Sequence, residues 1–127
     1  MNLEKVIFAF FIVLALTLNF GFYLGEIDNP DHHSVYALYA ALVASLIASV
    51  LKIGDRRQVG AVLLATSLVA DLQLIAAATV WAYAEQISAT GLTPQLMTVI
   101  VSLSGGALLA NLISVVLLVA ETITIRR

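Results

Sequence analysis

Cysteine is absent from this sequence of 127 residues, and charge is scarce, because Lys, Arg, Asp and Glu together make up 11% of it. The absence of cysteine excludes disulfide bonds, thiolate catalysis and iron–sulfur ligation. A soluble domain normally carries about a quarter charged residues. With 61% hydrophobic residues, the chain has too little polar surface for water, and its composition suits a lipid bilayer.

Short motifs of the common enzyme classes are absent as well. The sequence contains no phosphate-binding glycine loop, no nucleophile elbow and no zinc-binding helix motif. Its six basic residues are too few for a nucleic-acid surface. We therefore expect neither an enzyme nor a nucleic-acid-binding protein, and we expect no cofactor and no resident metal.

Four long apolar stretches fill most of the chain. Each reaches about 20 residues, the length that a helix needs to cross the hydrocarbon core. They predict one all-α domain over residues 1–127, an integral membrane bundle of four transmembrane helices at about 4–25, 30–53, 56–86 and 94–124. The first stretch continues without a small-residue cleavage site, so we expect a retained helix and not a signal peptide.

The links between the stretches carry helix-boundary signals. Asn29-Pro30 and Thr93-Pro94 each combine a capping residue with proline at the first helical position. Gly54 is suited to end the second helix in a left-handed conformation, and Asp55 to cap the third. Links this short favour antiparallel neighbours in a compact bundle.

The basic residues predict the orientation of the bundle. If the chain crosses four times, all six fall on one side, and the loops at 26–33 and 85–93 contain none. Because cytoplasmic segments are enriched in Lys and Arg, we expect both termini in the cytoplasm and the protein in a plasma membrane, in bacteria the inner membrane. The six residues are Lys5, Lys52, Arg56, Arg57, Arg126 and Arg127.

Asp71 is the main candidate for a functional group, because it lies near the middle of the third stretch. An Asp at a helix centre costs about 2.5–3.5 kcal/mol on insertion scales and normally faces protein or water. Helical periodicity puts Ser67 on the face of Asp71, and Gln73 with Thr66 on the opposite face. The functional interpretation is a cation or proton site, and the structural one is a hydrogen-bonded Asp that fixes packing. The second polar face suggests contact with another subunit.

Two further helices carry polar residues at a similar depth. Asn111 in the fourth stretch and Asn19 and Thr17 in the first fall near the predicted midplane. Asparagine can coordinate a cation through its oxygen or pair with a carboxyl group. The hypothesis is that Asn111, with Asn19 or Thr17, forms one site with Asp71. For the asparagines alone, ordinary interhelical hydrogen bonding is the favoured interpretation.

Small residues predict close helix packing at two places. Ala37, Ala41 and Ser45 recur at four-residue spacing in the second stretch, a row that Ser49 continues, and small residues at this spacing let helices approach closely. Adjacent glycines, Gly105 and Gly106, have the same effect in the fourth stretch. A local break that exposes backbone carbonyls is the alternative at this point.

The first outer loop is rich in acidic residues and histidine. Glu26, Asp28, Asp31, His32 and His33 lie within eight residues, with no Lys or Arg between them. Such a loop predicts an electronegative vestibule that attracts cations. His and Asp are also ligands for transition metals, but adjacent histidines are not a specific metal spacing. Capping of the second helix is the simpler interpretation.

These features predict a small cation channel or a cation- or proton-coupled transporter. The acidic mouth would concentrate a monovalent or divalent cation, and Asp71 would bind it at the midplane. A water-filled path needs more interior than four helices offer, so we expect a symmetric homo-oligomer in the lipid bilayer. The alternative is a structural or accessory subunit of a larger membrane complex, without transport activity of its own.

Overall fold

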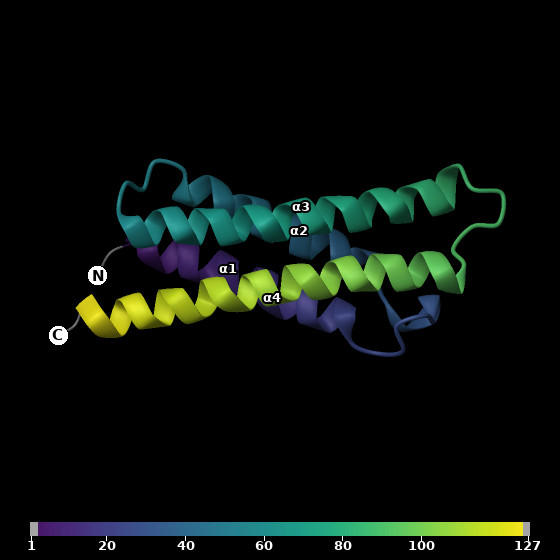
Figure 1. The fold of residues 1–127 in the computed structure, drawn as a ribbon, viewed down its shortest axis with the longest axis horizontal. Coiled ribbons are helices and arrows are strands. Elements are labelled where there is room, and N and C mark those ends of the chain that lie inside the picture. Colours follow the sequence, from purple (N-terminus) through teal and green to yellow (C-terminus); the bar gives the residue numbers. More distant parts are fainter. Residues whose placement is uncertain (1–2, 126–127) are drawn as a thin grey trace.

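A computed structural model describes residues 3–125, and over these residues the protein is a bundle of helices without strands (Figure 1). Each of the four long helices is long and apolar enough to cross a membrane, which indicates a multi-pass membrane protein. The helices are α1 (Leu3–Tyr23), α2 (Val35–Lys52), α3 (Gln58–Gln86) and α4 (Pro94–Ile125), and a short 3-10 helix, η1 (Pro30–His32), precedes α2.

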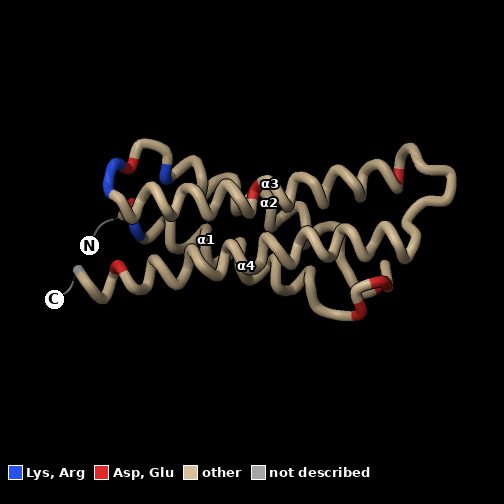
Figure 2. The backbone as a smooth tube through the Cα atoms, viewed as in Figure 1, with Lys and Arg blue, Asp and Glu red and all other residues tan. Residues whose placement is uncertain are grey.

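The four helices form a ring in which consecutive helices are neighbours. α1 packs against α2 and α4, and α3 packs against the same two helices. The α2–α3 loop lies at the end of the bundle where α1 begins and α4 ends, and the α1–α2 and α3–α4 loops lie at the other end (Figure 1). Figure 2 shows the described Lys and Arg residues at the first of these ends, which we call the basic end, and we call the other the acidic end.

Many of the large apolar side chains point outward, whereas alanines fill much of the interior. Leu72 is 69% exposed and Leu109 62%, whereas Ala41, Ala48 and Ala77 are fully buried. Without a hydrophobic drive between helices in lipid, membrane bundles associate through close packing of small residues. The bundle therefore presents to its surroundings the surface that acyl chains solvate.

The buried apolar residues form two clusters at different heights. The cluster nearer the acidic end is built around Phe22, Leu38, Trp81 and Met97, and the cluster nearer the basic end is Phe8, Ile12, Ala48 and Leu63. Buried polar side chains lie between the two clusters. We call them the polar layer, defined as Ser45, Ser49, Ser67, Asp71, Asn111 and Ser114.

The helix boundaries agree with two of the predicted signals and differ at two others. Gly54 has a φ of 94° just after α2, and the Thr93 hydroxyl accepts from the Leu96 amide at the start of α4, as predicted. Asn29, however, caps η1 and not α2, which begins five residues after Pro30. Asp55 accepts from the Arg57 amide in the loop, so it precedes the α3 N-cap, Arg57, instead of occupying that position.

Candidate functional site

Asp71 lies close to the midpoint of α3 and points towards α2. Ser45 Oγ donates to its Oδ1 at 2.6 Å, and Ser49 Oγ donates to its Oδ2 at 2.5 Å. Asp71 is 4% exposed as a whole residue, so its carboxyl oxygens depend on protein donors. A charged or strongly polar group in an apolar interior persists only with such partners.

The two serines belong to the site because they lie one helical turn apart on the same face of α2. The spacing of small residues in α2 predicted only close packing for Ser45 and Ser49, and this prediction was incomplete. Two hydroxyl groups at four-residue spacing, at the depth of a buried acid on the next helix, were the signal for this role. Ser49 Oγ also lies 3.1 Å from the Ser45 carbonyl oxygen, so its single proton has two acceptors within reach.

Other polar atoms of the layer are buried without a described partner. These atoms are Ser67 Oγ and both amide atoms, Nδ2 and Oδ1, of Asn111. Ser67 precedes Asp71 by one turn of α3. Two contacts fix the register of antiparallel α3 and α4: Thr66 bonds to Ser114, and Gln73 packs against Gly106. Asn111 lies between Gly106 and Ser114 along α4, so its level falls between those of Ser67 and Asp71 on α3. The predicted coincidence in depth of Asn111 and Asp71 therefore holds, although no described hydrogen bond joins them.

Asn19 and Thr17 are not partners of Asp71, contrary to the sequence-based expectation. In the amide orientation that satisfies both groups, Asn19 donates to the Ser104 carbonyl and accepts from the Leu108 amide, each at 3.0 Å. It thus binds the backbone of α4. Thr17 is exposed and donates to the Leu14 carbonyl of its own helix. The position of a residue along its helix did not show which neighbouring helix its side chain contacts.

The second polar face of α3 meets α4 inside the same chain. Thr66 Oγ1 lies 2.5 Å from Ser114 Oγ, and the Gln73 amide fills the space that the missing side chain of Gly106 leaves. A Cβ atom at Gly106 would lie 2.0 Å from Gln73 Oε1. The two opposite faces of α3 are thus used against α2 and α4, and the second face gives no reason to require another subunit. α4 is continuous through both glycines, which excludes the predicted alternative of a break.

The site offers oxygen ligands in a closed environment. A carboxyl group, two or three hydroxyl groups and one amide oxygen are the ligand types that bind a proton or a hard cation. In this conformation the apolar cluster around Phe22 and Trp81 covers the layer on one side, and the cluster around Phe8 covers it on the other. Within the described residues, Asp71 is therefore enclosed by protein.

At the acidic end the two histidines have different roles. His33 is buried, and its Nδ1 and Nε2 lie 2.5 Å from Phe22 O and 2.7 Å from Glu26 O. His32 Nδ1 accepts from the Glu26 amide at 2.8 Å. The histidines therefore organise the loop, and among residues 3–125 no three or more His, Cys, Asp or Glu side chains are arranged so that they could hold a metal ion together. Glu26, Asp28 and Asp31 are exposed beside them, where the vestibule was predicted.

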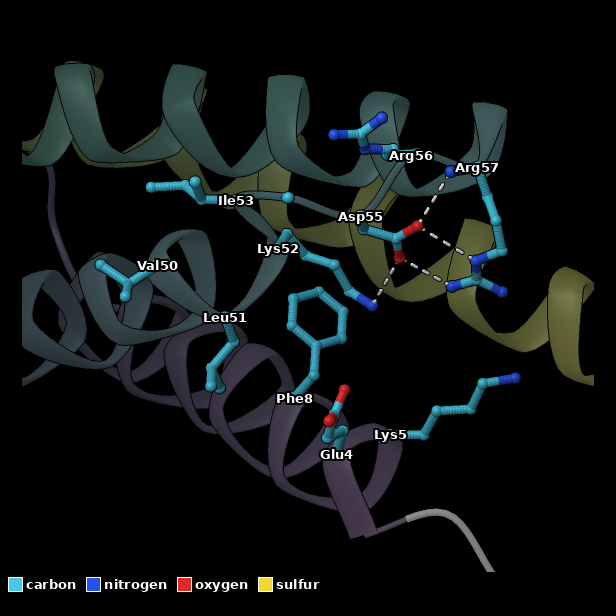
Figure 3. Close-up of a pocket in the computed structure, with 11 residues that line it drawn as sticks. Glu4, Lys5, Phe8, Val50, Leu51, Lys52, Ile53, Asp55, Arg56 and Arg57 are labelled. Carbon is cyan, nitrogen blue, oxygen red and sulfur yellow. Dashed lines mark hydrogen bonds and ion pairs between the residues drawn. The ribbon is translucent and has the colours of Figure 1, made fainter.

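At the basic end an ion-pair network ties the α2–α3 loop to α4. Figure 3 shows the part of this network in which Asp55 meets Arg57 and Lys52. Asp55 accepts from Arg57 through both oxygens, at 3.1 and 2.8 Å, and lies 3.4 Å from Lys52 Nζ. Arg57 also pairs with Glu121 of α4. The hydrogen bonds from Arg57 hold the pKa of Asp55 well below its usual value of 3.8, against the opposing effect of burial. The same bonds raise the pKa of Arg57.

Comparison with known proteins identifies a family. The family model described as "Family of unknown function (DUF6394)" matches residues 32–122, which include α2, α3, most of α4 and the whole polar layer. No curated protein and no solved structure matches the chain significantly.

Proposed function

The chain belongs to the DUF6394 family, and we propose from its polar layer that it is a membrane transporter that binds a cation or a proton at Asp71. The observation that carries the proposal is a buried carboxyl group held by two hydroxyl groups at mid-bundle. Such a group costs several kcal/mol to place there and is a functional site by default.

The atoms around Asp71 support binding and not only packing. Ser67 and Asn111 present buried polar atoms without described partners at the same height. Buried polar atoms that are left unpaired cost about 1–3 kcal/mol each, so their persistence needs a compensating ligand, ion or water. A cation bound between Asp71, Ser67 Oγ and Asn111 Oδ1 would satisfy these oxygen atoms together, whereas the Nδ2 donor of Asn111 needs an acceptor such as water.

The closed surroundings favour a carrier over an open channel. An ion at the polar layer would have to pass one apolar cluster to enter and the other to leave. Alternating rearrangement of the helices around a fixed midplane site achieves this in other transporters. The exposed acids at the acidic end would attract cations to that side. We place the basic end in the cytoplasm and retain a symmetric homo-oligomer as part of this proposal.

Ion flux into liposomes tests the role of Asp71. Protein reconstituted with a pH-sensitive or sodium-sensitive dye inside should carry H⁺ or Na⁺, and Asp71→Asn should reduce the flux at least tenfold, because the amide neither ionises nor replaces the charge. Thr17→Val is the matched control, since it removes an exposed hydroxyl group that bonds only to its own helix. Equal flux through Asp71→Asn and the parent would refute the proposal.

A second candidate function is an accessory subunit of a larger membrane complex. It is favoured by the complete pairing of both Asp71 oxygens within the chain, which suits a role in packing α2 against α3. Purification from native membranes distinguishes the two functions. A stoichiometric foreign partner, together with no flux from the isolated chain, would support the accessory role.

A further inference from the structure

An open cavity of about 850 Å³ lies at the basic end, between α1, the end of α2 and the α2–α3 loop (Figure 3). Lys5 and Phe8 come from α1, and Arg56 lies across the cavity in the loop. Lys52 lies between them, with its Nζ 4.3 Å from the centre of the Phe8 ring. The cavity is therefore lined by cationic groups that three different segments supply.

The charges that line the cavity are unbalanced. Four cations, Lys5, Lys52, Arg56 and Arg57, line the cavity with two carboxylates, Glu4 and Asp55. Because Glu121 of α4 also pairs with Arg57, a surplus of one positive charge remains. Asp55 already serves both Lys52 and Arg57. No hydrogen bond or ion pair joins Lys5 or Arg56 to another described residue. The cavity thus contains cationic groups that are free to bind an anion.

An apolar groove continues from this cavity along α2. The groove has a volume of about 220 Å³ and is lined by Leu46, Ile47, Val50 and Leu51, of which Val50 and Leu51 also line the cavity. It runs from the charged end towards the middle of an apolar helix. A cationic pocket with an apolar extension matches a ligand that has an anionic head and a hydrocarbon tail.

We propose that the cavity and the groove together bind one anionic phospholipid. Lys5, Lys52 and Arg56 contact its phosphate, and one acyl chain lies along Val50 and Leu51. Basic pockets between transmembrane helices recognise anionic headgroups in this way. A free phosphate ion would leave the groove unused, and the added choline cation of a zwitterionic lipid would meet the surplus positive charge. The inference is independent of transport at Asp71.

Native mass spectrometry of the full chain in detergent tests the inference, with phosphatidylglycerol, phosphatidylcholine and inorganic phosphate as separate probes. The parent should bind phosphatidylglycerol more tightly than phosphatidylcholine. The double variant Lys5→Gln/Arg56→Gln should lose about 25-fold in affinity for phosphatidylglycerol, because each basic residue near an anionic headgroup contributes about fivefold. Both side chains are outside the ion-pair network, so the variant should fold.

A second pair of variants tests the groove. Val50→Trp fills it and should weaken the binding of both lipids, whereas Val43→Trp, on an exposed part of α2 outside the groove, should leave binding unchanged. Three outcomes would overturn the inference. They are equal affinity of the parent for the two lipids, unchanged phosphatidylglycerol binding by the double variant, and displacement of the lipid by equimolar inorganic phosphate with no effect of Val50→Trp.

Discussion

The hydroxyl groups of Ser45 and Ser49 donate the two hydrogen bonds that hold the Asp71 carboxyl group. Ser45 Oγ has one described acceptor, Asp71 Oδ1, whereas Ser49 Oγ lies within reach of both Asp71 Oδ2 and the Ser45 carbonyl. A cation or proton that arrives at Oδ2 would compete with the bond from Ser49. Ser49 could then turn to the carbonyl without losing a hydrogen bond, so this serine offers a local response to binding.

Alanine substitutions test this arrangement at the residue scale. Ser45→Ala and Ser49→Ala should each lower the free energy of unfolding by about 1–3 kcal/mol, because each leaves one buried carboxyl oxygen without its donor. Unfolding in mixed micelles by increasing denaturing detergent measures the change. Ser102→Ala, on the exposed face of α4, is the control and should stay within about 0.5 kcal/mol of the parent.

A double-mutant cycle identifies the cause of any loss. In an Asp71→Leu background the acceptor is gone, so Ser45→Ala should have almost no further effect. If Ser45→Ala destabilises the parent and the Asp71→Leu variant equally, the serine acts through packing and the hydrogen bond contributes nothing measurable.

Among the helices, α4 is closely approached by both α1 and α3 within about one turn. Asn19 of α1 binds the backbone between Ser104 and Leu108, and Gln73 of α3 occupies the space beside Gly106. Gly105 approaches Tyr23 of α1, where an added Cβ would lie 2.9 Å from Cε1. The adjacent glycines therefore allow α1 and α3 to contact α4 at one height.

Substitution of Gly106 tests this contact. Gly106→Ala should destabilise the bundle by about 1–3 kcal/mol, because the new methyl group overlaps the buried Gln73 amide. Gly21→Ala is the matched control, since no atom lies within 4 Å of its added Cβ, and it should be neutral or stabilising by about 0.5–1 kcal/mol. Gln73→Ala combined with Gly106→Ala should restore stability. A Gly106→Ala variant as stable as Gly21→Ala would contradict the close contact.

In the molecule as a whole, the ion-pair network at the basic end connects the α2–α3 loop with the end of α4. Arg57 begins α3 and joins Asp55 of the preceding loop to Glu121 near the end of α4. The carboxylates hold a guanidinium group that is 42% exposed, so solvent reduces the contribution of each pair to about 1 kcal/mol or less. The network orients the loop and does little to hold the helices together.

The pKa of Asp55 gives this network a defined pH dependence. Because the pKa in the folded protein is below the usual 3.8, the stabilisation is present above pH 3.8 and is lost as the pH falls below it. Thermal unfolding in detergent should therefore show that the parent loses stability between pH 7 and pH 3. The Asp55→Asn variant should lose less stability over the same range. Identical pH profiles for the two proteins would show that Asp55 contributes nothing to stability.

The membrane-protein class and the main candidate residue were predictable from the order of amino acids alone. Chain hydropathy and stretch length are local properties, so they predicted four membrane-spanning helices without knowledge of packing. The positions of Asp71 near mid-helix and of the basic residues at one end of the bundle followed from counting along the helices. The helix boundaries at Thr93-Pro94 and Gly54 were also predictable, because their effects depend on neighbouring residues alone.

The contacts between side chains of different helices became known from the packing of the bundle. Ser45 and Ser49, and not Asn19 or Thr17, are the partners of Asp71, because the rotation and vertical register of α2 against α3 select the contacting faces. The Gln73 face meets α4 of the same chain for the same reason. Helical periodicity defines the faces of each helix separately. Which face of one helix contacts which face of the next depends on the packing of all four helices.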